Sequence, residues 1–263
     1  MTGQITNVPR SVDGYYKICY IHAGDDPGSG GSDAMTGTEV AEARRLRGWT
    51  QTDLARRLGA SQPYVSLLEG DRRAVPRRLA RRLARVLRLP PSALPIGSVR
   101  QPLDSRRAAS ALGRMGYPGF AYLRAGDTMN PAEVLVRTLK AANVDARIVE
   151  ALPWVLLAYP RLDWDWLVRE VKSNDLQNRL GFVVTLARRL AQGRGGSRAV
   201  ETLSHWEHVL GRSRLQREEA FRVSLTDAER QWLRANRSTE AAQWNVLSTL
   251  PDTVPPHAAQ SPA

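Results

Sequence analysis

The sequence predicts an all-α protein with two unequal helical parts. Three observations support this fold class. Capping residues, glycines and prolines recur where helices should begin and end. Apolar residues repeat every three or four positions, the period of a helix with one buried face. Of the 263 residues, 42% are hydrophobic, which is enough for a sizeable core. We expect a five-helix domain near the N-terminus, followed by a larger helical bundle or solenoid-like domain.

Residues 1–36 are expected to form a flexible N-terminal extension. The run 24–32 is rich in glycine and serine, a composition typical of linkers. A phosphate-binding loop is a poor alternative, because no Gly-Lys-Ser/Thr sequence follows it. Met35 could be an alternative translation start, in which case the preceding segment would be optional.

Residues 37–97 carry signals for four short helices and a last helical turn. Hydroxyl side chains precede three of the expected helices, and glycine or proline follows each helix. Asp53 stands in the reciprocal capping position of the second helix, and Pro63 lies in the first turn of the third. The start and stop residues are Thr38 and Gly48, Thr50 and Gly59, Ser61 and Gly70, and Pro76 and Pro90, with the last turn at 92–94.

The positive charge is concentrated in this same part of the chain. The whole protein has a net charge of +12. Between Gly37 and Arg100 there are fourteen arginines, no lysine and five acidic residues, a net charge of +9. Such a surface favours polyanionic partners, of which nucleic acid is the usual one and an anionic membrane surface the competing one.

The most specific motif extends from Gly48 to Arg73. Its elements are, in order, Thr50-Gln51, Leu54-Ala55, Leu58-Gly59, Ser61-Gln62, Val65 and Leu68-Glu69. In type and spacing they resemble the helix-turn-helix of XRE-type regulators, the Cro and phage-repressor family. The resemblance covers 38–94, about a quarter of the chain. Trp49, Pro63 and Asp71 depart from the usual pattern, and Pro63 makes the base preference unpredictable.

This resemblance implies that the helix from Ser61 to Leu68 enters the major groove of double-stranded DNA. Gln62 could then pair with adenine through both ends of its amide. Gln51 matches the family residue that touches a phosphate and supports the first glutamine of the recognition helix. Arg72 and Arg73 stand where the family grips the DNA backbone. The complete set of expected DNA-binding residues is Gln51, Ser61, Gln62, Pro63, Tyr64, Ser66, Leu67, Arg72 and Arg73.

Six further arginines lie on the fourth expected helix. We expect them to form a solvated face rather than to read bases, although some could add to the nonspecific attraction for DNA. They are Arg77, Arg78, Arg81, Arg82, Arg85 and Arg88.

The remainder of the chain is divided into three expected segments. Residues 98–129 are expected to be a linker, 130–236 an all-helical domain, and 237–263, with four prolines among the last thirteen residues, a disordered tail. Within the domain, Pro153 is expected to interrupt or restart a helix. The expected helix starts are Asn130, Asp145, Asp163 and Asp175, with further helices around 202–210 and 226–235.

No pattern in the sequence indicates an enzyme, a cofactor or a metal site. His205 and His208 could share a helix face, but no third ligand accompanies them. Asp163 and Asp165 alternate with tryptophans at an expected helix start, a common structural arrangement. With Cys19 as the only cysteine, no disulfide framework is possible. Without a signal pattern or a run of about 18 apolar residues, we expect a cytoplasmic protein that does not enter membranes.

Three functional hypotheses remain for the larger helical domain. It could dimerise or bind a partner for a DNA-binding repressor that acts as a homodimer on an operator. It could bind a toxin, since the runs 147–154, 163–167 and 176–184 are similar to regulators paired with AbiE-type nucleotidyltransferase toxins. The protein would then be an antitoxin that also represses its own operon. Alternatively, a pocket near Trp154, Trp164 and Trp166 could bind a small effector.

Overall fold

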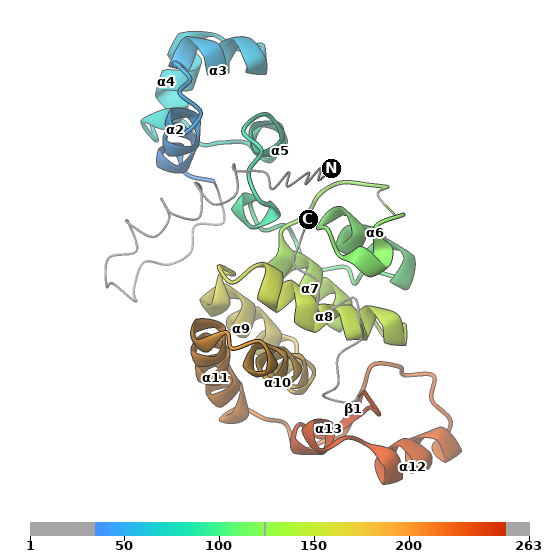
Figure 1. The fold of residues 1–263 in the computed structure, drawn as a ribbon. Coiled ribbons are helices and arrows are strands. Elements are labelled where there is room, and N and C mark those ends of the chain that lie inside the picture. Colours follow the sequence, from blue (N-terminus) through green and yellow to red (C-terminus); the bar gives the residue numbers. More distant parts are fainter. Residues whose placement is uncertain (1–34, 124, 251–263) are drawn as a thin grey trace, which may run out of the picture. The chain divides into compact units, whose positions relative to one another are not determined.

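The computed structural model describes residues 35–123 and 125–250, which divide into two compact units between Gly97 and Ser98 (Figure 1). These residues contain twelve α-helices, two 3₁₀ turns and only two strands of two residues each. The predicted all-α fold class is therefore confirmed. No helix within this part of the chain is long and apolar enough to cross a bilayer. Most of the expected extension, 1–34, and the end of the expected tail, 251–263, lie outside the described residues.

The first unit contains the five expected helical segments. They are α2 (Gly37–Arg45), α3 (Gln51–Leu58), α4 (Gln62–Glu69), α5 (Arg77–Val86) and the 3₁₀ turn η1 (Pro91–Ala93). Thr50 and Asp53 form the predicted capping box, and Gly59 ends α3 in the left-handed conformation at φ 55°. The predicted cap of the first helix is wrong: Thr36, not Thr38, caps α2, because Glu39 completes a capping box with Thr36.

The core of the first unit forms where α3, α4 and α5 face one another. Val65 and Leu68 of α4 are buried, as their spacing predicts. Met35 is also buried, at 4% exposure, so the last two residues of the expected extension belong to this unit. The remaining large apolar side chains of this core are Val40, Leu54, Leu58, Val75, Leu83, Leu87 and Leu89.

A close backbone contact fixes the start of α2 against the end of α4. The backbone N–H of Gly37 donates a hydrogen bond of 2.6 Å to Oδ1 of Asp71. A Cβ at Gly37 would lie 1.8 Å from the carbonyl oxygen of Leu68, so only glycine fits there. Asp71, which departs from the family pattern and has a φ of 52°, thus accepts the N–H of the first residue of α2 in addition to the cap by Thr36.

The second unit is built around one long helix. Its elements are α6 (Ser105–Arg114), η2 (Pro118–Phe120), α7 (Pro131–Leu139), α8 (Ala146–Ala158), α9 (Trp164–Ser173), α10 (Gln177–Gly193), α11 (Ser197–Gly211), β1 (Glu219–Ala220), α12 (Asp227–Asn236), α13 (Thr239–Gln243) and β2 (Val246–Leu247). Helix α10 contacts α8, α9, α11, α13 and both strands. Its residues from Gln177 to Ala187 are all buried, so α10 is the centre of this unit.

Two helix boundaries differ from expectation. Pro153 lies inside the continuous helix α8 and is buried there, so it does not restart the helix. The long helix is preceded by Leu176 rather than capped by Asp175, whose φ of 55° places it in the turn before the helix. The other predicted helix starts, Asn130, Asp145 and Asp163, each accept a backbone hydrogen bond as caps. Thr226, at the edge of the helix expected around 226–235, caps α12.

The predicted linker 98–129 is wrong, because this segment contains α6 and η2 and contributes to the core. Leu103, Leu112 and Phe120 are buried. Tyr117 packs edge-on against Trp154 of α8, with 5.4 Å between ring centroids. Aromatic burial of this kind holds the segment 98–129 against the rest of the second unit. The sequence did not predict it, because α6 and η2 are short and contain few large apolar side chains, so no helical periodicity is evident.

The predicted disorder is also wrong for 237–250. Helix α13 begins at Thr239, and β2 pairs in parallel with β1, so the second unit is not purely helical. Trp244 is 1% exposed and donates a 2.7 Å hydrogen bond from Nε1 to Oγ1 of Thr185 on α10. Its ring fills the space above Gly181, where a Cβ would lie 2.3 Å from the indole. This one side chain therefore fastens the segment to the central helix.

We predict that Gly181→Ala destabilises the second unit by about 1–3 kcal/mol, because the added methyl forces Trp244 out of its site. The measurement is urea unfolding followed by tryptophan fluorescence, since six of the seven tryptophans belong to this unit. Gly193→Ala on the same helix is the matched control, because a Cβ there meets nothing within 4 Å. Equal unfolding midpoints for the two variants would contradict the proposed role of Gly181.

Candidate nucleic-acid interface

Helices α3 and α4, of eight residues each, are joined by the short turn 59–61. Their buried faces hold the two helices together, and this leaves one face of α4 toward solvent. At the start of α4, Gln62 and Pro63 are exposed, while Ser66 and Leu67 one turn later are half-buried. The arrangement presents a short helix whose first turn is its most accessible part, as recognition helices in the major groove require.

A chain of polar contacts runs from the core of this unit to the exposed start of α4. Arg44 of α2 forms a bidentate ion pair with Glu69, with its Nε 2.6 Å and its Nη2 2.9 Å from the carboxylate oxygens. Nε2 of Gln51 donates to the same carboxylate at 3.0 Å. Nε2 of Gln62 donates to Oε1 of Gln51 at 2.7 Å. Four side chains from three helices are thus connected in series.

The chemistry of the carboxylate fixes the direction of this chain. An ionised carboxylate only accepts hydrogen bonds, so the amide group of Gln51 must turn its NH₂ toward Glu69. The carbonyl oxygen of Gln51 then faces Gln62 and requires an NH₂ group from it. Consequently, Oε1 of Gln62 and the second hydrogen of its NH₂ stay available outside the chain. This acceptor and donor are the pair that an adenine edge needs.

The Arg44–Glu69 pair is well shielded from water. The two side chains are 10% and 5% exposed, respectively. The pKa of Arg44 lies above its ordinary value, because the hydrogen bonds to Glu69 and the attraction of its charge outweigh desolvation. Arg44 also donates to the carbonyl oxygen of Trp49, at the start of the turn before α3. Removing either partner would leave an uncompensated charge in a buried position.

Several other predicted DNA-binding residues lie around the exposed end of α4. Ser61 caps the helix by accepting a bond from the N–H of Tyr64. The guanidinium of Arg73 lies 4.9 Å from the centroid of the Tyr64 ring, so these two side chains are positioned together. Arg72 and Arg73 are exposed just beyond α4. All nine predicted residues therefore come from α3, from Ser61 directly before α4, from α4 itself, and from the segment directly after it.

Two features of this region were not anticipated. Trp49, one of the departures from the family pattern, is covered by the guanidinium of Arg57 at 4.1 Å from its ring centroid. Arg82 of α5 extends toward the turn between α3 and α4, where a Cβ at Gly59 would lie 3.5 Å from its Nη2. The six arginines assigned to a solvated face are all exposed, so they add positive potential to the unit.

In the second unit, Trp154, Trp164 and Asp163, three of the residues considered for chemistry, have structural roles, whereas Asp165 is exposed and Trp166 is half-buried. Trp154 is 1% exposed, and Trp164 is stacked on Trp206 with 5.4 Å between ring centroids. Asp163 caps α9. Trp154 and Trp164 therefore belong to the core rather than to the effector pocket considered above. Within the described residues, no three His, Cys, Asp or Glu side chains are grouped to hold a metal ion.

Comparison with known proteins supports the assignment of the first unit. Residues 40–94 match the family model described as helix-turn-helix. No curated protein and no solved structure matches the chain. The matched residues include α3, the buried Arg44–Glu69 pair, and α4 with its exposed first turn. Residues 40–94 are therefore an XRE-type helix-turn-helix domain, a DNA-binding module that occupies about a fifth of the chain.

Proposed function

We propose that this protein is a sequence-specific transcriptional repressor that reads its operator with α4. The observation that supports this most strongly is the ordered chain from Arg44 to Gln62, which holds a base-reading amide in one orientation. Preorganisation of this kind lowers the entropy lost on binding. Gln62 would contact a base edge, with Pro63, Ser66 and Leu67 packing against neighbouring bases.

The proposed phosphate contacts surround this base-reading end. Arg72 and Arg73 are exposed cations beside α4, and Tyr64, Ser61 and Gln51 carry polar groups near its start. Contacts of this type set the position of the protein on the duplex and contribute no sequence preference. The exposed arginines of α5 would strengthen the salt-dependent attraction to any DNA.

We further propose that the protein acts as a homodimer. Helix α4 has eight residues and is therefore roughly 12 Å long, which spans only three or four base pairs. One copy would thus read too short a sequence to distinguish an operator from the rest of a genome. Two copies on half-sites one helical turn apart would double the sequence read.

We predict that Gln62→Ala weakens binding to the operator by about 1–3 kcal/mol and leaves binding to random DNA unchanged, because only the base contact is lost. Arg72→Ala should instead weaken binding to both DNAs alike and reduce the slope of log K against log salt by about one. The measurement is fluorescence anisotropy with DNA from upstream of the gene, between 50 and 300 mM salt.

The exposed Arg169 of α9 provides the matched control, because Arg169→Ala removes the same charge from the second unit. We expect this variant to bind both DNAs as the unchanged protein does. If Gln62→Ala weakened operator and random DNA equally, the proposed reading of bases by α4 would be excluded. An absence of salt-dependent binding to the upstream DNA would exclude the repressor function itself.

A second proposed function, capture of a partner protein, rests on an apolar groove in the second unit. The groove has a volume of about 330 Å³ between α8, α12 and the end of β2. Its lining is mainly apolar, with Val144, Ala146, Val149, Phe221, Leu225, Leu233, Leu247 and Leu250, and it also includes the polar residues Glu150, Arg222, Ser248 and Thr249. Helix α12 has no buried residue, and its Trp232 is 59% exposed, as is Val223 nearby in the chain.

Exposed apolar side chains beside an apolar groove are typical of surfaces that bind another protein. An amphipathic helix of a partner could place its apolar face in such a groove. We propose that a toxin fills this position, so that the protein is an antitoxin whose DNA binding regulates its own operon. The resemblance of the runs 147–154, 163–167 and 176–184 to regulators paired with AbiE-type toxins is the sequence feature that suggested this proposal.

We predict that Leu233→Asp reduces co-purification with a toxin encoded beside the gene at least tenfold, because a carboxylate would be buried in the apolar groove. Trp232→Asp should weaken the complex as well. Because Trp232 is exposed, we expect this variant to fold as the unchanged protein does. Gln231→Asp places the same charge at an exposed position of the same helix and should have no effect. If all three variants retained the toxin, the groove would not be its binding site.

A further inference from the structure

The chain turns back along α4 directly after that helix ends. The backbone N–H of Asp71 donates to the carbonyl oxygen of Leu68 at 3.1 Å, and the N–H of Arg72 donates to that of Leu67 at 3.0 Å. These two hydrogen bonds form a Schellman motif, in which the residue just beyond the helix cap adopts the left-handed conformation. Asp71 occupies that position with a φ of 52°. The turn therefore returns the following residues to the side of α4.

The turn places Arg73 over the ring of Tyr64. The guanidinium carbon of Arg73 lies 4.9 Å from the ring centroid. Tyr64 is half-buried and packs against the core of the first unit, and its backbone N–H donates to the hydroxyl of Ser61. The ring is therefore held in place at the start of α4. It supports an exposed arginine that would otherwise extend into solvent in many conformations.

The charge of Arg73 is not used within the domain. The two acidic residues closest to it in the sequence are Glu69 and Asp71. Glu69 belongs to the chain of contacts described above, and the Asp71 carboxylate accepts the N–H of Gly37 and the hydroxyl of Thr38. In the described part of the protein, the Arg73 guanidinium has no hydrogen bond or ion pair. Its N–H donors therefore stay available for phosphate oxygens.

We propose that Tyr64 is a positioning residue of the DNA interface, which holds the Arg73 guanidinium ready for a backbone phosphate. The face of its ring, rather than its hydroxyl, carries this role, and the proposal rests on the DNA binding proposed above. A free arginine loses rotamer entropy when it binds, and contact with the ring removes part of that loss in advance. Because a phosphate contact reads no base, Tyr64 supports binding to every DNA sequence alike.

The experiment compares binding of full-chain variants to operator and random DNA by fluorescence anisotropy at fixed salt. Tyr64→Leu removes the ring, keeps an apolar side chain against the core, and should weaken binding to both DNAs about two- to fivefold. Tyr64→Phe keeps the ring and should bind as the unchanged protein does. So should Tyr122→Leu, the matched control at a tyrosine that is 75% exposed in the second unit. In Arg73→Ala, Tyr64→Leu should have no further effect, because no guanidinium remains to be positioned.

NMR of the free protein provides a readout that does not depend on DNA. An aromatic ring shifts the resonances of protons above its face, so the side-chain resonances of Arg73 should move in Tyr64→Leu and stay in place in Tyr64→Phe. The proposal is overturned if they do not move in Tyr64→Leu, or if Tyr64→Leu binds DNA as the unchanged protein does. It is equally overturned if Tyr64→Phe weakens binding as much as Tyr64→Leu, because the hydroxyl would then be the group that contacts DNA. If the unchanged protein did not bind DNA, the proposed function would fail, and this proposal with it, whatever the NMR spectra showed.

Discussion

The ion pair between Arg44 and Glu69 is the interaction on which the proposed DNA interface depends. It joins α2 to α4 in a position that is shielded from water, and its carboxylate also accepts a hydrogen bond from α3. Because a carboxylate has no hydrogen to donate, each amide beyond it can take only one orientation. The ion pair that joins α2 to α4 therefore also determines which atoms of the Gln62 amide face the proposed DNA site.

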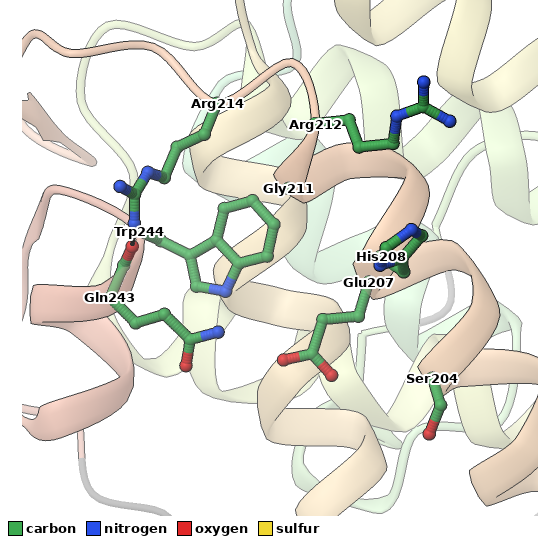
Figure 2. A pocket seen from close by; sticks show the side chains of 8 residues that line it. All are labelled: Ser204, Glu207, His208, Gly211, Arg212, Arg214, Gln243 and Trp244. Carbon is green, nitrogen blue, oxygen red and sulfur yellow. Dashed lines mark hydrogen bonds between the residues drawn. The ribbon is translucent and has the colours of Figure 1, made fainter.

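The second unit depends in a similar way on one helix. Helix α10 is buried on all sides over its first three turns, and most other elements of the unit contact it. The Trp244 ring packs against Gly181 of this helix and donates a hydrogen bond to Thr185. The last described segment of the chain is thereby anchored to α10. Trp244 also lines a cavity of about 420 Å³ between α11 and this segment, together with Glu207 and Arg214 (Figure 2). The apolar groove that we propose for a partner lies where the same segment meets α12.

Local signals in the sequence were sufficient for the first unit and insufficient for parts of the second. Caps such as Thr50, Ser61 and Asp163 act within four residues, so they could be recognised directly. The burial of Trp244 depends on Gly181, sixty-three residues away, and no local pattern reveals such a contact. The nine predicted interface residues do gather around α4. Only two of them, Gln51 and Gln62, belong to the hydrogen-bonded chain, and its other members, Arg44 and Glu69, were not predicted, because no local pattern joins residues this far apart in sequence.

The most direct test of this account is a double-mutant cycle between Glu69→Gln and Gln62→Ala, measured as operator affinity relative to random DNA at fixed salt. An amide at position 69 can turn either way, so it no longer imposes one orientation on Gln51 and Gln62. We predict that Glu69→Gln reduces the preference for the operator when Gln62 is present and has little further effect in Gln62→Ala. Additive losses would contradict the account, because they would show that Gln62 is oriented independently of the buried carboxylate.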